Sequence, residues 1–125
     1  MIKKNLFALF VFTSLALAGC ASNLGVYDPS VPQNRLCTLT IDSTLSVTRF
    51  DGKAVDWSSL LSVADTVIQI PAGQHSFVMD YWARGGDYIR SAENIRYSDT
   101  FEAGKSYVMR PAESNGRVFI LKHTK

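Results

Sequence analysis

Apolar and polar residues alternate at every second position over much of residues 36–123. In the segment CTLTID, for example, Cys37, Leu39 and Ile41 fall on one side and the threonines between them on the other. A period of two is typical of β-strands with one buried face. The same alternation returns in the segments LSVTRF, TVIQIP, HSFVMDYW, IRYSDTF, SYVMRP and RVFILKH. The pattern therefore predicts strands along most of this region.

Turn-forming residues separate these segments at steady intervals. Asp51-Gly52 and Asn115-Gly116 favour tight hairpins, because both residues of each pair tolerate a positive φ. Further turn signals are Pro71-Ala72-Gly73 and Ala103-Gly104. We count seven or eight short strands and no long helix. This predicts an all-β fold, a single small antiparallel β-sandwich that covers residues 35–125.

One internal segment, VDWSSLLSVAD, fits two structures. Trp57, Leu60, Leu61 and Ala64 lie at helical spacing, and Asp56 could cap a helix that starts there. A short helix and a folded loop both remain open. In either case we expect Trp57 in the core.

The N-terminus follows a different pattern. Lys3 and Lys4 precede an apolar stretch from Leu6 to Ala18. As a helix this stretch would be roughly 20 Å long, shorter than the bilayer core of about 30 Å. Positive charge, then apolar residues, then small residues is the layout of a secretory signal. We expect residues 1–19 to be a cleaved signal peptide; an ordinary signal with a chance cysteine is the alternative.

The end of the leader resembles the lipobox of bacterial lipoproteins, on Leu17, Ala18, Gly19 and Cys20. The resemblance implies cleavage between Gly19 and Cys20, an S-diacylglycerol group on Cys20 and an N-acyl chain such as palmitate on its amine. Two or three acyl chains would hold the protein at a membrane essentially permanently. In such lipoproteins an Asp directly after the cysteine favours the inner membrane. Here Ala21 follows, which favours the outer membrane.

The expected mature chain is formally neutral. Removing Lys3 and Lys4 from the 13 basic residues leaves 11, against 11 acidic residues. The net charge of +2 thus belongs to the leader, and no nucleic-acid partner is predicted. Residues 105–125 are more basic, with Glu113 as the sole acid. That stretch fits either a solvated strand face or a contact with anionic lipid or glycan.

Residues 20–34 hold two of the four prolines and show no apolar periodicity. We interpret them as the lipidated N-terminus and a flexible tether, with an end-to-end distance of roughly 20 Å. Cys37 has no unlipidated partner in the chain. Both a buried, inert thiol and an intermolecular disulfide remain open for it in an oxidising compartment.

A second resemblance covers roughly residues 36–123. The turn Pro71-Ala72-Gly73, followed by Gln74, His75 and an alternating strand, resembles PEGA-type and transthyretin-like β-sandwich domains of small envelope lipoproteins. The later Gly104-Lys105-Ser106-Tyr107 stands where such domains begin another strand. The resemblance implies a scaffolding or binding role and no catalytic residues.

No motif in the sequence indicates an enzyme. His75 and Asp80 are five residues apart, which on a strand places them on opposite faces. The other histidine, His123, has no partner nearby in the sequence, and no group of His, Cys, Asp and Glu has metal-ligand spacing. We predict no catalytic residue, no metal and no cofactor.

The hairpin DYWARGGDYIR is the candidate binding surface. If Gly85-Gly86 is its turn, the strand pairs are Arg84 with Asp87, Tyr81 with Arg90, and Trp82 with Ile89. Aromatic and arginine side chains favour protein interfaces and ligand sites. The candidate residues are Trp82, Arg84, Tyr88 and Arg90. Alternatively, the aromatic rings are core and the arginines cover them. Phe77 and Met79 define the expected inward face, so Trp82 is expected to point outward.

These observations predict a membrane-anchored, non-enzymatic lipoprotein of the cell envelope, facing the periplasm or the surface. Its partners would be the membrane, through the lipid, and an envelope protein that it binds or braces. The alternative is a module that binds glycan or a small ligand through hairpin 74–90. A hydrolase with a site assembled from distant residues is the third hypothesis.

Overall fold

The computed structural model describes residues 22–58, 64–85 and 88–125. The expected signal peptide and Cys20 lie outside the described residues. The elements in chain order are β1 (Ser22–Val26), the 3-10 helix η1 (Gln33–Arg35), β2 (Leu36–Ile41), β3 (Leu45–Phe50), β4 (Lys53–Trp57), β5 (Thr66–Pro71), β6 (Gly73–Gly85), β7 (Tyr88–Phe101), β8 (Ser106–Ser114) and β9 (Arg117–Thr124). No helix in these ranges is long and apolar enough to cross a bilayer.

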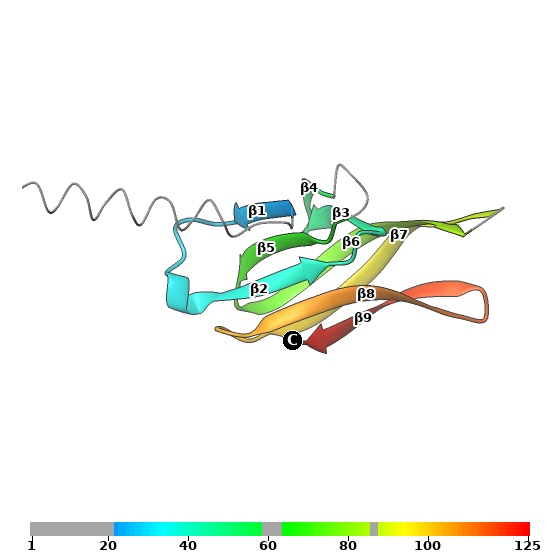
Figure 1. Cartoon of the computed structure of the whole chain (residues 1–125). Helices are drawn as coiled ribbons and strands as arrows, with labels where there is room; N and C mark the ends of the chain where they lie inside the picture. Colours follow the sequence, from blue (N-terminus) through cyan, green and yellow to red (C-terminus); the bar gives the residue numbers. More distant parts are fainter. Residues whose placement is uncertain (1–21, 59–63, 86–87) are drawn as a thin grey trace, which may run out of the picture.

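The strands form two sheets that pack face to face (Figure 1). One sheet has the order β1-β5-β2-β8-β9 and the other the order β4-β3-β6-β7. The all-β sandwich predicted from the alternation is confirmed, with nine described strands instead of seven or eight. Most neighbours are antiparallel, but β1 runs parallel to β5 and β2 runs parallel to β8. The chain crosses between the sheets at Ala72, between β5 and β6.

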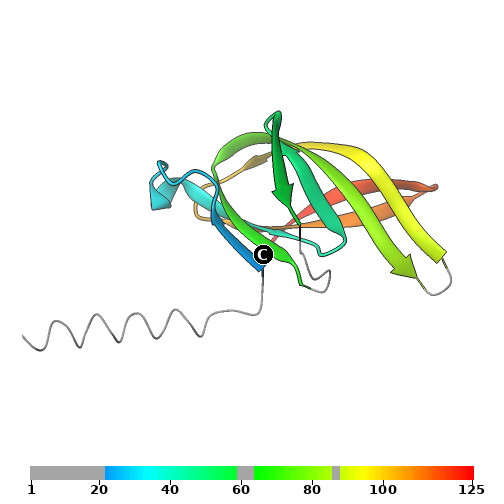
Figure 2. The ribbon, with the colours of Figure 1, turned by 90° about the horizontal axis from the view of Figure 1, so that it is seen from above.

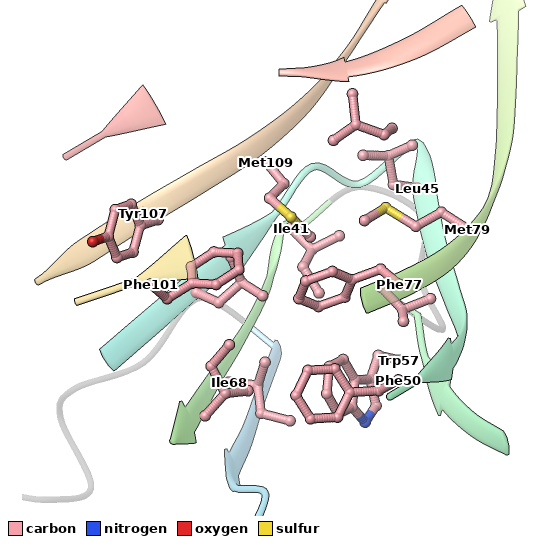
Figure 3. Close-up of a cluster of buried hydrophobic side chains, with 14 of the residues drawn as sticks. Ile41, Leu45, Phe50, Trp57, Ile68, Phe77, Met79, Phe101, Tyr107 and Met109 are labelled. Carbon is pink, nitrogen blue, oxygen red and sulfur yellow. The ribbon is translucent and has the colours of Figure 1, made fainter. Parts of the chain in front are cut away.

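The core consists of the inward residues that the alternation selects. Cys37, Leu39 and Ile41 of β2 are buried, as are Phe77 and Met79 of β6. Figure 3 shows side chains of both sheets meeting between the layers. The other core members are Leu45, Val47, Phe50, Trp57, Ile68, Ile70, Tyr81, Phe101, Tyr107, Met109 and Ile120. Side chains of this size fill the roughly 10 Å between two packed sheets.

Two turns have the backbone that their sequences predict. Asp51 and Gly52 have φ values of 49° and 79°, and Asn115 and Gly116 have values of 51° and 76°. A positive φ at both central residues is the conformation that matches the twist of a two-residue hairpin. These turns connect β3 to β4 and β8 to β9.

The tether predicted for residues 20–34 contains secondary structure, so that prediction is wrong for its described part. Strand β1 pairs with β5, and the ring of Tyr27 lies 4.8 Å from Phe50 and 5.4 Å from Trp57. Leu24 and Val26 of β1 are 43% and 37% exposed. An edge strand without a buried face has no apolar alternation, which explains why the sequence pattern missed it.

The ambiguous segment begins as a strand. Trp57 ends β4 and is buried, as expected, but Asp56 lies within that strand and caps no helix. Residues 59–63, which include Leu60 and Leu61, lie outside the described residues.

The register of the β6–β7 hairpin differs from the predicted one: each β6 residue near the turn pairs with a β7 residue two positions later than predicted. Gly85 pairs with Tyr88, and residues 86 and 87 lie outside the described ranges. Consequently Trp82 lies opposite Ser91. The other pairs that replace the predicted ones are Tyr81 with Ala92, Ala83 with Arg90, and Arg84 with Ile89. The sequence does not fix this register, because neither glycine of the Gly85-Gly86 pair has a side chain that favours one pairing over another.

Candidate functional site

Two long hairpins extend from the same end of the sandwich. The β6–β7 hairpin belongs to the four-stranded sheet and the β8–β9 hairpin to the five-stranded sheet. Their tips point in the same direction and stay apart in both views (Figures 1 and 2). β7 and β9 are each the last strand of their sheet. No described strand pairs with the outer edge of either one.

A groove of about 560 Å³ lies between these two end strands. We call it the edge groove. Its lining includes inward residues of both strands: Ala92, Ile95 and Tyr97 of β7, and Val118 and Ile120 of β9. All of these but Ile120 remain partly exposed. The exposed residues Glu93, Arg96, Arg117 and Phe119 also line it. The sandwich is therefore incompletely closed along this side.

Beyond Ile120, at the end of the sandwich that we call the closed end, Lys122 of β9 contacts β7. Its Nζ lies 3.0 Å from an Asp99 carboxylate oxygen and donates a 2.7 Å hydrogen bond to the Thr100 carbonyl. It also lies 4.9 Å from the ring centroids of Phe101 and Tyr107. A cation near aromatic faces adds attraction to the ion pair. These contacts join β7 and β9 directly.

Two titrating groups at this closed end influence each other. The Tyr97 hydroxyl donates a 2.6 Å hydrogen bond to Asp99. That bond is the main cause that lowers the pKa of Asp99, together with the Thr100 N–H and Lys122. Burial, followed by the hydrogen bond to Asp99, raises the pKa of the Tyr97 hydroxyl. Asp99 is thus held as the charged acceptor and Tyr97 as the neutral donor.

At the open end, the two hairpins are tied by an ion pair between Arg90 of β7 and Glu113 of β8. Both side chains are partly exposed. A second hollow of about 500 Å³ lies here, and Tyr81, Ser91, Gly116 and Val118 complete its lining. The sequence analysis did not connect Arg90 to Glu113, because 23 residues separate them and no local pattern relates them.

No family model, no curated protein and no solved structure matches this chain.

The residues predicted to form one binding surface do not all lie on one face. Trp82 is 50% exposed and points outward, as expected, and Arg84 is exposed on the same side. Arg90 lies opposite Ala83 and reaches the other hairpin, so it belongs to the inward side. Tyr88 lies opposite Gly85. Trp82 and Arg84 line a separate recess of about 260 Å³ with Ser43, Thr44 and Ala83.

His75 forms a buried contact that the sequence did not reveal. Its Nδ1 lies 2.6 Å from an Asp51 carboxylate oxygen, and its Nε2 lies 2.5 Å from the Pro71 carbonyl oxygen. The other Asp51 oxygen accepts a 2.9 Å hydrogen bond from the Ser76 N–H. Both ring nitrogens are thus engaged, and the contact ties the β3–β4 turn to β6. Asp80 lies on the opposite face of β6, as predicted.

The described residues contain no cluster of His, Cys, Asp and Glu that could hold a metal ion. His123 is exposed. Cys37 is 1% exposed, and its thiol donates to the Ile70 carbonyl at 3.5 Å. Burial raises the pKa of this thiol. A buried thiol with a raised pKa contains little thiolate and reacts slowly, which agrees with the expectation of an inert residue.

Proposed function

We propose that this protein is a lipid-anchored, non-enzymatic module of the bacterial cell envelope, and that it holds a protein partner in the edge groove. The leader and the lipobox-like sequence ending at Cys20 support the anchor. Ala21 after that cysteine supports the outer membrane over the inner membrane. The proposal needs neither a cofactor nor a metal.

The observation that carries the binding role is the placement of two end strands on either side of an apolar groove. An unpaired strand edge offers N–H and C=O groups to an added strand. An extended peptide that joins such an edge gains main-chain hydrogen bonds, and pockets for alternate side chains give specificity. The occupant we propose is therefore an extended segment of another envelope protein with apolar residues at every second position.

The chemistry of the two histidines supports a non-enzymatic role. A general base needs a ring nitrogen within reach of the proton that it removes. Both nitrogens of His75 instead contact Asp51 and Pro71, and the Ser76 side chain projects from the other face of β6. His123 is exposed near the end of β9.

A glycan-binding role on the outer face is the second candidate. It is favoured by the half-exposed indole of Trp82 above a recess that also contains the side chains of Ser43 and Thr44. A flat aromatic ring beside hydroxyl groups suits a sugar ring. This candidate uses a surface separate from the edge groove, so the two can be tested independently.

The anchor is tested by metabolic labelling with an alkyne fatty acid. The wild-type protein should be labelled and recovered with membranes, whereas Cys20→Ala should be unlabelled. Equal labelling of Cys20→Ala would contradict the anchor.

The groove is tested by recovery of partners from solubilised envelope. Val118→Arg places a charge in the apolar lining, and Leu121→Arg places the same charge on the opposite face of β9, where Leu121 is 40% exposed. The proposal predicts that Val118→Arg loses a partner that Leu121→Arg retains. Equal retention by both variants, with both folded, would contradict the groove as the binding site.

A further inference from the structure

The outer face of the four-stranded sheet carries two arginines in one row. Arg49 of β3 lies opposite Val78 of β6, and Val78 lies opposite Arg96 of β7. The two arginine Cα atoms are therefore separated by two strand spacings, about 10 Å. Their long side chains can converge over the valine between them.

The two arginines line a hollow of about 180 Å³. Ser76 and Ser98 form the neighbouring cross-strand pair, and both belong to the lining. Arg49 donates one hydrogen bond, to the Gly52 carbonyl at 3.3 Å. Among the described residues, neither arginine forms an ion pair with a carboxylate. The hollow thus combines two positive charges with two hydroxyl groups.

Two of the acidic residues on or next to these strands, Asp51 and Asp80, are engaged elsewhere. Asp51 accepts from the Ser76 N–H and contacts His75, and Asp80 accepts from the Asn94 N–H at 3.0 Å. Asn94 is the extra residue of a bulge in β7 and has a φ of 56°. These bonds hold the carboxylates to the backbone, so both arginines keep unused donors.

We propose that this hollow, which we call the arginine hollow, binds a phosphate group. An arginine binds such a group through two parallel N–H donors, and charge-assisted hydrogen bonds are the strong ones. A tetrahedral anion presents oxygens in several directions at once. It can accept from one guanidinium on each side and from the serine hydroxyls of the adjacent row, whereas a planar carboxylate has two oxygens to share.

The available space agrees with this ligand. At roughly 30 Å³ for each water in the liquid, 180 Å³ corresponds to about six waters, which is enough for one phosphate group with bound water. The arginine hollow lies on the outer face of its sheet, whereas the apolar side chains of Ala92 and Ile95 in the edge groove face inward. Arg96 belongs to the lining of both, so the two sites adjoin. The proposal rests on the two arginines and two serines of the hollow, and it does not depend on whether the groove binds a protein.

The phosphate can be free in the compartment or can belong to a lipid headgroup. The full-length protein, purified in neutral detergent, is titrated with inorganic phosphate while the arginine side-chain NMR signals are recorded. A second sample is placed in nanodiscs of phosphatidylcholine with or without phosphatidylglycerol. Shifts of Arg49 and Arg96 with inorganic phosphate indicate the free ion. Shifts of the same arginine signals that occur only in nanodiscs with phosphatidylglycerol indicate that the bound phosphate belongs to a lipid headgroup.

The matched variants are Arg49→Gln, Arg96→Gln and, as control, Arg110→Gln. Arg110 is an exposed strand arginine on the outer face of the other sheet. Loss of a hydrogen bond to a charged group costs about 1.5–3 kcal/mol, so each of the first two variants should weaken binding at least tenfold. Arg110→Gln should change it less than about twofold. Absence of shifts in both samples, or equal effects of all three variants, would overturn the proposal.

Discussion

The two ends of this sandwich contrast in what lies between the sheets. At the closed end, aromatic rings pack between the sheets. The ring centroid of Phe50 lies 4.8 Å from that of Trp57 and 5.2 Å from that of Phe77. The ring centroids of Phe101 and Tyr107 lie 5.2 Å apart. At the hairpin end, the inward residues of β6 and β7 include Ala83 and Ala92. Large rings can span the roughly 10 Å between sheets, and alanines cannot. The same strands therefore form a packed core at one end and an open groove at the other.

The first way to test this contrast is to remove a ring from the closed end. Phe77 is 1% exposed and contacts Phe50 and Phe101. Phe77→Ala should lower the free energy of unfolding by about 3–5 kcal/mol, the cost of a cavity plus the lost burial. Urea denaturation measures this change in the free energy of unfolding. Val118→Ala, at the hairpin end, should lower the free energy of unfolding clearly less than Phe77→Ala. Equal decreases for the two variants would mean that both ends are packed alike.

The second test uses pH at the closed end. The pKa of Asp99 is lowered in the folded protein, first by the Tyr97 hydrogen bond. The stabilisation is therefore present above the unfolded-state pKa of about 4 and is lost as pH falls through the lower folded pKa. At neutral pH the wild type should have a higher melting temperature than Asp99→Asn. The two melting temperatures should converge as the solution is made acidic. A melting-temperature difference that stays constant down to about pH 2 would contradict stabilisation by the Asp99 carboxylate.

The two tryptophans give a third test, in which the outward Trp82 is expected to have a small effect. Trp57 is 6% exposed and Trp82 is 50% exposed. Trp82→Ala should change the free energy of unfolding by about 0.5 kcal/mol or less, as surface substitutions do, whereas Trp57→Ala should cost about 3–5 kcal/mol. If the melting temperature of Trp82→Ala is as low as that of Trp57→Ala, Trp82 is part of the core. Loss of retention on polysaccharide resin by a stable Trp82→Ala would favour the glycan candidate.

The smallest expected effect concerns the ion pair between the hairpins. Arg90 and Glu113 are 52% and 34% exposed. Exposed pairs contribute about 0.2–1 kcal/mol. A double-mutant cycle with Arg90→Ala and Glu113→Ala should give a coupling energy in that range, and it should shrink with added salt. A coupling that salt leaves unchanged would indicate a buried, rigid link between the hairpins.

The sequence predicted the interior strands and the Asp51-Gly52 and Asn115-Gly116 turns well, because burial of one face imposes an alternation and positive φ demands particular residues. It missed β1, whose Leu24 and Val26 stay exposed, and it left open the segment that forms β4. Edge strands bury too little to show a period. The contacts of Asp51 with His75 and of Arg90 with Glu113 join distant parts of the chain. Such contacts depend on strand order, which no local pattern encodes.

The central claim is that the edge groove receives an extended segment of another protein. It is tested most directly by placing a photo-crosslinking amino acid at Ile95 of β7, at Val118 of β9 or at the outward Trp82, in cells that make the full-length protein. The account predicts that Ile95 and Val118 crosslink to the same short segment of the same partner, and that Trp82 does not. Crosslinks from Trp82 alone, or none from either groove position in folded protein, would contradict it.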